Sequence, residues 1–264
     1  MDVIEQMKEQ SKAGWASFIP FENATGIAAA QLVSFARVSE GSHLLDVACG
    51  TGVVALTAAH HGVTAEGVDL TPELVERARE NAQIARLNVK FTEGDVEALP
   101  FQDASFDFVL SQFGHMFGPR AALTTKELLR VLKPKGVIAF STWPPDFFTG
   151  NLFQLLGKYS PPPPEGITSP VSWGKPDFIR EQLGNSVKDL VFDSGQMRLP
   201  GLSPVHIRIF AERNIGPVKK LIGTLEPSPE KLQTFRAELE SLIMRYFEDN
   251  SMRQDFLMTR AIKL

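Results

Sequence analysis

The fold is decided by the stretch LLDVACGTGVVAL, which runs from Leu44 to Leu56. Its apolar beginning predicts a buried strand and its apolar end predicts the first turn of a helix, with Gly50 and Gly52 between them. Glycine has no Cβ, so the backbone of such a turn can approach a ligand closely, and the N–H groups that open the helix point toward it. Strand, turn and helix together predict a binding site for a nucleotide-like cofactor.

An acidic residue, Asp46, lies four positions ahead of Gly50. A carboxylate there would repel a pyrophosphate, whereas it would favour a ligand with a cationic α-amino group, such as S-adenosylmethionine. The run from Gly50 to Ala55 also fits the alanine-ended form of the dinucleotide fingerprint. The turn by itself therefore does not choose between NAD and S-adenosylmethionine.

Two further acidic residues follow the next two predicted strands. Asp69 ends the strand expected at 63–69, where its carboxylate could accept hydrogen bonds from two vicinal ribose hydroxyls. Asp95 follows the strand expected at 88–93 and could accept a hydrogen bond from an adenine amino group. Because ligands of doubly wound sheets bind at the carboxyl ends of the strands, we expect these residues and the glycine turn to converge on one adenosine ligand.

Strand-like runs alternate with helical patterns from Ser42 to Thr142, which is typical of a parallel sheet covered by helices. The expected strands cover 43–48, 63–69, 88–93, 105–110 and 136–142, and the expected helices lie near 52–61, 72–86 and 120–132. Two later strand patterns, at 187–199 and 256–264, would complete the sheet. We therefore predict an α/β, doubly wound, Rossmann-like fold with a mostly parallel sheet of seven strands.

The rest of the chain reads as elaboration of one domain that spans 1–264, with its cofactor-binding core at about 40–145. The elaborations are expected at about 1–30, 144–186 and 200–250 as helical cap insertions that select the substrate. Prolines between Pro144 and Pro176 exclude a long regular helix across that region and predict a loop or cap. Ser228 and Pro229 predict the start of a later helix.

The composition is that of an ordinary globular protein, with 43% hydrophobic residues, 22% charged residues and a net charge of -4. This balance gives no bulk attraction to polyanions, so we expect a small-molecule partner and no nucleic acid. We find neither a signal-peptide core nor an apolar run of about 18 residues, so we expect a cytoplasmic protein without a membrane span. The single cysteine, Cys49, excludes an internal disulfide. Nothing in the sequence predicts an oligomeric state.

Five motifs follow one another in the region 40–145: DVACGTG at 46–52, GVDL at 67–70, GDVEALPF at 94–101, SFD at 105–107 and ELLRVLKPKG at 127–136. In this order they resemble the class I S-adenosylmethionine-dependent methyltransferases, the group that includes the ubiquinone/menaquinone-biosynthesis enzymes and many small-molecule methyltransferases. One departure is Lys135, where many relatives have glycine; Gly136 is kept.

The resemblance implies an enzyme that binds S-adenosyl-L-methionine and releases S-adenosyl-L-homocysteine. It implies the following cofactor contacts: Asp46, Ala48, Gly50 and Gly52 near the methionine moiety, Asp69 and Leu70 on the ribose, Asp95 and Val96 on the adenine, and the backbone around Ser111 and Gln112 toward the methionine amino group.

Methyl transfer from a sulfonium is an in-line displacement in which the protein mainly positions the reactants. A base is needed only where the nucleophile must lose a proton. His115 is the candidate, because it follows the fourth predicted strand and histidine can titrate near neutral pH; the alternative is a structural loop histidine. Phe113, Met116, Phe117 and Trp143 would line an apolar acceptor site, although core packing explains them equally well.

The acceptor is expected to be a small, partly hydrophobic molecule, with the acceptor atom (O, N or C) left open. The loop after the fourth strand offers no acidic cluster for magnesium, so we expect no metal. Two alternatives are carried forward. One is a non-catalytic S-adenosylmethionine-binding protein that recruits a partner through 200–250, and the other is an NAD-dependent reductase, which Asp46 and Asp95 disfavour.

Overall fold

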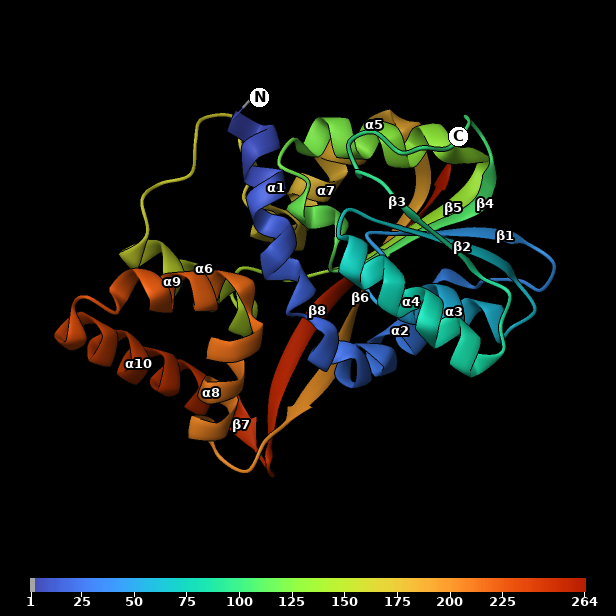
Figure 1. Ribbon diagram of the computed structural model, residues 1–264. Helices are drawn as coiled ribbons and strands as arrows, with labels where there is room; N and C mark the ends of the chain where they lie inside the picture. Colours follow the sequence, from blue (N-terminus) through green and yellow to red (C-terminus); the bar gives the residue numbers. More distant parts are fainter. Residues whose placement is uncertain (1–2) are drawn as a thin grey trace.

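Over residues 3–264, which the computed structural model describes, eight strands form one sheet in the order β3-β2-β1-β4-β5-β8-β6, with β7 paired to β8 (Figure 1). The first five strands run parallel, and β8 is antiparallel to both β5 and β6. The strands are β1 (His43–Val47), β2 (Thr64–Asp69), β3 (Lys90–Glu93), β4 (Phe106–Gln112), β5 (Leu132–Thr142), β6 (Val187–Pro200), β7 (Phe247–Glu248) and β8 (Ser251–Lys263). The predicted α/β sheet is confirmed, and the two-residue strand β7 is an addition to its seven expected strands.

Three helices connect the parallel strands, as the sequence predicts: α3 (Val53–Ala59), α4 (Pro72–Ala85) and α5 (Ala121–Val131). Proline occupies the first position of α4, where its missing N–H costs no hydrogen bond. The winding of the chain reverses between β1 and β4. Ligands of such sheets bind beside this point, at the carboxyl ends of the strands.

The two faces of the sheet are buried in two separate hydrophobic clusters. Side chains alternate between the faces along each strand, since successive Cβ atoms of a strand point in opposite directions. One cluster takes Leu45, Val109 and Ile138, and the other takes their neighbours Leu44, Leu110 and Ala139. Burial on both sides explains why these strands read as continuous apolar runs.

The remaining helices precede or follow the five parallel strands, except η2, which lies between β4 and α5. They are α1 (Val3–Ala16), η1 (Ile19–Phe21), α2 (Glu22–Ala36), η2 (His115–Phe117), α6 (Phe148–Tyr159), η3 (Pro170–Gly174), α7 (Pro176–Leu183), η4 (Gly184–Ser186), α8 (Pro204–Asn214), α9 (Gly216–Leu225) and α10 (Pro229–Met244). None of the helices within residues 3–264 has both the length and the apolar character needed to cross a membrane.

The proline-rich region after β5 contains more helix than the sequence predicts. The helix α6 fits between Pro145 and Pro161, because no proline falls inside its 12 residues. The longest stretch of this region without regular helix or strand runs from Ser160 to Ser169. The prolines therefore set the ends of α6 and do not prevent it.

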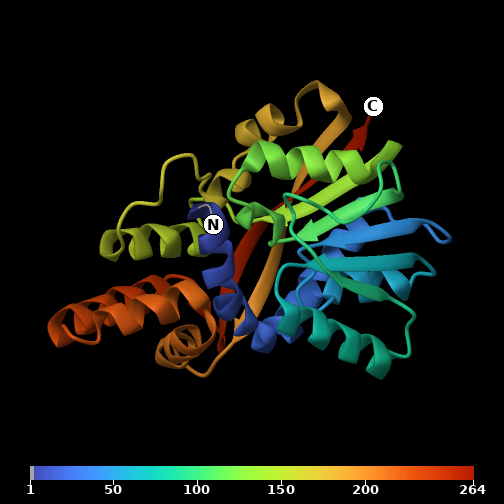
Figure 2. The same ribbon diagram turned by 45° about the horizontal axis from the view of Figure 1, so that its top comes forward.

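A third hydrophobic cluster builds a cap from α6, α8, α9 and α10. Phe235 and Leu239 of α10 are fully buried in it, together with Leu199 of β6 and Met252 of β8. The cap therefore rests on the far ends of β6 and β8, as Figures 1 and 2 show, and α1 runs between the cap and the edge formed by β1 to β4.

Lys135 lies in an irregular stretch of β5, where the pairing with β4 shifts register between Phe106 and Phe108. Its φ is +66°, in the left-handed region that disfavours residues with a Cβ. The position that departs from the family pattern is thus one whose backbone favours glycine.

We predict that Lys135→Gly raises the free energy of unfolding by roughly 0.5–1 kcal/mol, because relief of left-handed strain outweighs the added freedom of the unfolded chain. Denaturant unfolding measures this change. The control is Lys90→Gly, at an exposed strand position with ordinary backbone, which should lower stability. Equal destabilisation by both substitutions would contradict the prediction.

Candidate functional site

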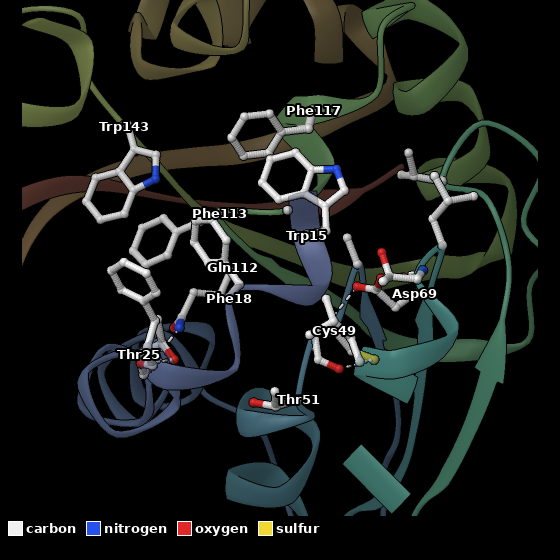
Figure 3. A pocket seen from close by; sticks show the side chains of 18 of the residues that line it. Trp15, Phe18, Thr25, Cys49, Thr51, Asp69, Gln112, Phe113, Phe117 and Trp143 are labelled. Atoms are coloured by element: carbon white, nitrogen blue, oxygen red, sulfur yellow. Dashed lines mark hydrogen bonds between the residues drawn. The ribbon is translucent and has the colours of Figure 1, made fainter. Parts of the chain in front are cut away.

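A cavity of about 250 Å³ opens at the carboxyl ends of β1 to β4 and extends beneath α1 and α6. Its walls include the turn after β1, the residues that follow β2, β3 and β4, and one side chain each from β6 and β8, Met197 and Gln254. Figure 3 shows acidic and small residues on one side and aromatic rings on the other. The cavity lies where a doubly wound sheet binds its ligand.

The turn between β1 and α3 uses its two glycines differently. Gly50 has φ +54° and a Cβ added there would meet nothing within 4 Å, so its backbone faces open space in the cavity. Gly52 has φ +83°, but an added Cβ would lie 2.6 Å from Cζ of Phe91 in β3. Gly50 therefore leaves room for a ligand, whereas Gly52 allows the turn to pack on the sheet and does not line the cavity.

Asp69 ends β2 and lines the cavity together with Leu70. Its carboxylate accepts hydrogen bonds from the backbone N–H of Gly50 at 2.8 Å and of Thr71 at 2.9 Å. Only 8% of the residue is exposed, and burial raises the pKa of the carboxyl. The turn and the acidic residue expected on the ribose are thus brought together, and the carboxylate oxygens keep further lone pairs for a ligand.

Asp46 lies behind the turn and does not line the cavity. Its Oδ2 accepts a hydrogen bond from the backbone N–H of Ala55 at 3.0 Å, near the start of α3, and its buried Oδ1 has no partner among the described residues. Burial, with a further contribution from the charge of Asp69, raises the pKa of Asp46 to about 8. Because Asp46 does not line the cavity, this placement does not support the expected direct contact with the methionine moiety.

Asp95 and Val96, the residues expected on the adenine, follow β3 and line the cavity. Asp95 Oδ1 accepts a hydrogen bond from the N–H of Glu97 at 2.9 Å, and Asp95 Oδ2 lies 2.5 Å from Nζ of Lys8 in α1. The same ammonium lies 2.5 Å from Oε2 of Glu97. These ion pairs hold α1 over the cavity, a role for Lys8 that sequence reasoning missed.

The end of β4 contributes two residues of different kinds. Ser111 is buried, donates its hydroxyl to the Val47 carbonyl at 2.7 Å and accepts the backbone N–H of His115, so it joins strands and does not line the cavity. Gln112 lines the cavity, and its Nε2 donates to the Thr25 carbonyl at 2.9 Å. The Oε1 of Gln112 is buried without a partner among the described residues.

His115 is not placed as a general base. It is fully buried between the rings of Phe140 and Trp173, with centroid distances of 4.5 Å and 4.7 Å, and does not line the cavity. Neither ring nitrogen has a hydrogen-bonding partner among residues 3–264. Burial lowers its pKa to about 3, so the imidazole is neutral and out of reach of an acceptor. This placement favours the structural alternative.

Of the four apolar residues predicted for the acceptor site, some line the cavity and one does not. Phe113, Phe117 and Trp143 line the cavity, while Met116 is fully buried in the core. Sequence reasoning missed Trp15 and Phe18, which reach the cavity from the N-terminal segment. Their only sequence signal was their aromatic character within a segment assigned to substrate selection.

Comparison with known proteins agrees with this geometry. A family model described as a methyltransferase domain matches residues 44–136. An uncharacterized protein of Mycobacterium tuberculosis is 35% identical over 88% of this chain and 85% of its own length. A demethylmenaquinone methyltransferase of Staphylococcus aureus is 41% identical over 105 residues, which are 38% of this chain and 43% of that protein.

Solved structures share the fold. The crystal structure of a putative methyltransferase from Bacillus halodurans superposes with a TM-score of 0.58 at 19% identity, over 89% of this chain and 98% of that one. At this identity the likeness concerns the fold alone. The family model and the ordered motifs show that this chain belongs to the class I S-adenosylmethionine-dependent methyltransferases, and the superposition agrees with their fold.

Proposed function

We propose that this methyltransferase moves the methyl group of S-adenosylmethionine to a small, partly hydrophobic acceptor bound in the same cavity. The observation that supports it is the division of the cavity, with the glycine turn and Asp69 on one side and a set of aromatic rings on the other (Figure 3). Cofactor and acceptor would then meet inside one enclosed space.

The residues along the strand ends fit the cofactor. The open space before Gly50 would take its methionine end, Asp69 with Leu70 its ribose, and Asp95 with Val96 its adenine. When bound, S-adenosylmethionine supplies an activated carbon and a neutral leaving group. The Asp95 carboxylate still has lone pairs for an adenine amino group beside its ion pair with Lys8.

The protein's own residues would align the two reactants and exclude water from them. Aligning two reactants at attack distance is worth up to about 7–11 kcal/mol, so positioning can supply much of the rate enhancement. α1 and the cap lie beside the carboxyl ends of the parallel strands and would keep water from the reacting atoms. His115 is not assigned a part in this chemistry.

Calorimetric titration of the purified protein, freed of copurified ligand, is the direct test. We expect S-adenosylmethionine and S-adenosylhomocysteine to bind, because Asp69 would hold the ribose and the space before Gly50 would take the methionine end. We expect NAD and NADP to give no heat, because the acidic residues near the turn would repel their pyrophosphate. Binding of the dinucleotides alone would overturn the proposal. Tight adenosyl binding without methyl transfer to any member of an acceptor panel would instead favour the non-catalytic alternative.

We predict that Asp69→Ala weakens binding of S-adenosylhomocysteine by roughly 1.5–3 kcal/mol, the cost of losing charge-assisted hydrogen bonds. Asp69→Asn keeps the size of the side chain and one acceptor oxygen, so its loss should be smaller. Glu73→Gln, outside the cavity, is the control and should leave the affinity unchanged. Unchanged affinity in Asp69→Ala would remove this residue from the site.

For His115 we predict a stability effect and no effect on turnover. The unfolded histidine takes up a proton below pH 6.5 while the folded one stays neutral down to about 3, so His115 lowers stability as the pH falls through this range. His115→Phe should therefore reduce the loss of unfolding free energy between pH 7 and pH 5 by about 2 kcal/mol. A large fall in turnover with unchanged cofactor affinity would restore the catalytic reading.

A further inference from the structure

The acceptor side of the cavity is an aromatic chamber, which we define by Trp15, Phe18, Phe113, Phe117, Trp143 and Phe148. These residues come from α1, from the loops after α1, β4 and β5, and from η2 and α6. Figure 3 shows their labelled members on the side of the cavity away from Cys49 and Asp69. The chamber is thus separate from the residues proposed to hold the cofactor.

One wall of the chamber is flat and firmly held. The rings of Phe113 and Trp143 are stacked, with centroids 3.9 Å apart and planes 16° apart, and Phe256 packs edge-on against both. The backbone of Phe113 has φ +60°, and its N–H donates to the Ser141 carbonyl at 2.9 Å. A stacked pair fixed in this way favours a planar, apolar guest.

The chamber offers no counter-ion to an anionic acceptor. The charged side chains that line the cavity in the described part of the chain are Lys8, Glu22, Asp69 and Asp95. All four already have partners: Lys8 pairs with Asp95, Glu22 binds Arg77 and Asn81, and Asp69 accepts two backbone N–H groups. An anion would be desolvated among the negative faces of aromatic rings with no free cation to compensate it, which is costly.

One neutral amide that lines the cavity has hydrogen-bonding capacity to spare. Gln254 of β8 is only 5% exposed and lines the cavity, yet its side chain makes no hydrogen bond to any residue of 3–264. It occupies the buried phase of β8, between Met252 and Phe256, where apolar residues are the rule. A buried polar group without a partner costs stability, so a ligand group that satisfies it gains affinity.

We propose that the acceptor is a planar aromatic molecule that has no negative charge and carries a hydroxyl or carbonyl group, and that Gln254 binds this group while the ring lies in the aromatic chamber. The flat wall selects the ring, the absence of a free cation rejects anionic analogues, and the amide holds the polar substituent. This inference rests on the proposed function, since it concerns the acceptor side of the same cavity.

Three probes of similar size test it by calorimetry on protein saturated with S-adenosylhomocysteine: β-naphthol (planar, neutral), β-naphthoate (planar, anionic) and β-decalol (non-planar, neutral). We expect β-naphthol to bind at least about tenfold more tightly than either of the others. Gln254→Leu should weaken β-naphthol roughly three- to tenfold, because it removes one hydrogen bond, and should leave S-adenosylhomocysteine affinity unchanged.

The matched control is Gln196→Leu, which changes an exposed glutamine that pairs with the neighbouring Asp255 on the same two strands. It should alter neither affinity. Equal or tighter binding of β-naphthoate, absence of β-naphthol binding, or an unchanged β-naphthol affinity in Gln254→Leu would each overturn the inference. Retained S-adenosylhomocysteine binding in these cases would leave the proposed function standing, whereas its loss in the unsubstituted protein would overturn both.

Discussion

The turn between β1 and α3 is the constraint on which the site depends, because it has to fit between neighbours that leave no room for side chains. A Cβ on Gly52 would enter the ring of Phe91, and one on Gly114 would lie 2.4 Å from Cβ of Ala48. The turn is therefore locked between β3 on one side and the loop after β4 on the other. Asp69 also fixes the turn, because its carboxylate accepts a hydrogen bond from the N–H of Gly50 at 2.8 Å. The ligand edge of the sheet is rigid before any ligand arrives, which reduces the entropy lost on binding.

Several carboxylates of this protein hold backbone N–H groups and neighbouring segments in place, whether or not they also line the cavity. Glu97 is 4% exposed and accepts hydrogen bonds from Lys8 and from the backbone and guanidinium of Arg120. Burial opposes its ionisation, but these bonds outweigh burial and lower its pKa. Glu97 thereby ties α1 to the segment that leads into α5. The closing helix and the adenine end of the site are joined by one buried charge, which stays ionised because its partners compensate it.

The acceptor side is assembled by a different route. Trp15, Trp143 and Gln254 come from three distant parts of the sequence, and they reach one cavity because the cap packs on β6 and β8 while α1 packs against α9 of the cap. The shared core of the fold presents the cofactor residues, whereas these additions enclose the space beside them. The Mycobacterium tuberculosis relative aligns over 88% of this chain and the family model over residues 44–136, so the likeness to that relative extends beyond the conserved core.

The sequence by itself determined the order of strands and helices from β1 to β5, the late strands β6 and β8, and the positions of Gly50, Asp69 and Asp95 at one edge. These features follow from local periodicity and from the rule that parallel strands end on the same side. Only the tertiary structure decided that Asp46 supports the turn from behind, that His115 is buried between aromatic rings, and that Lys8 and Gln254 reach the cavity. The contact between Lys8 and Asp95 joins residues 87 positions apart. Periodicity reports which face of an element is buried, but the direction of a loop side chain depends on what distant segments pack against it.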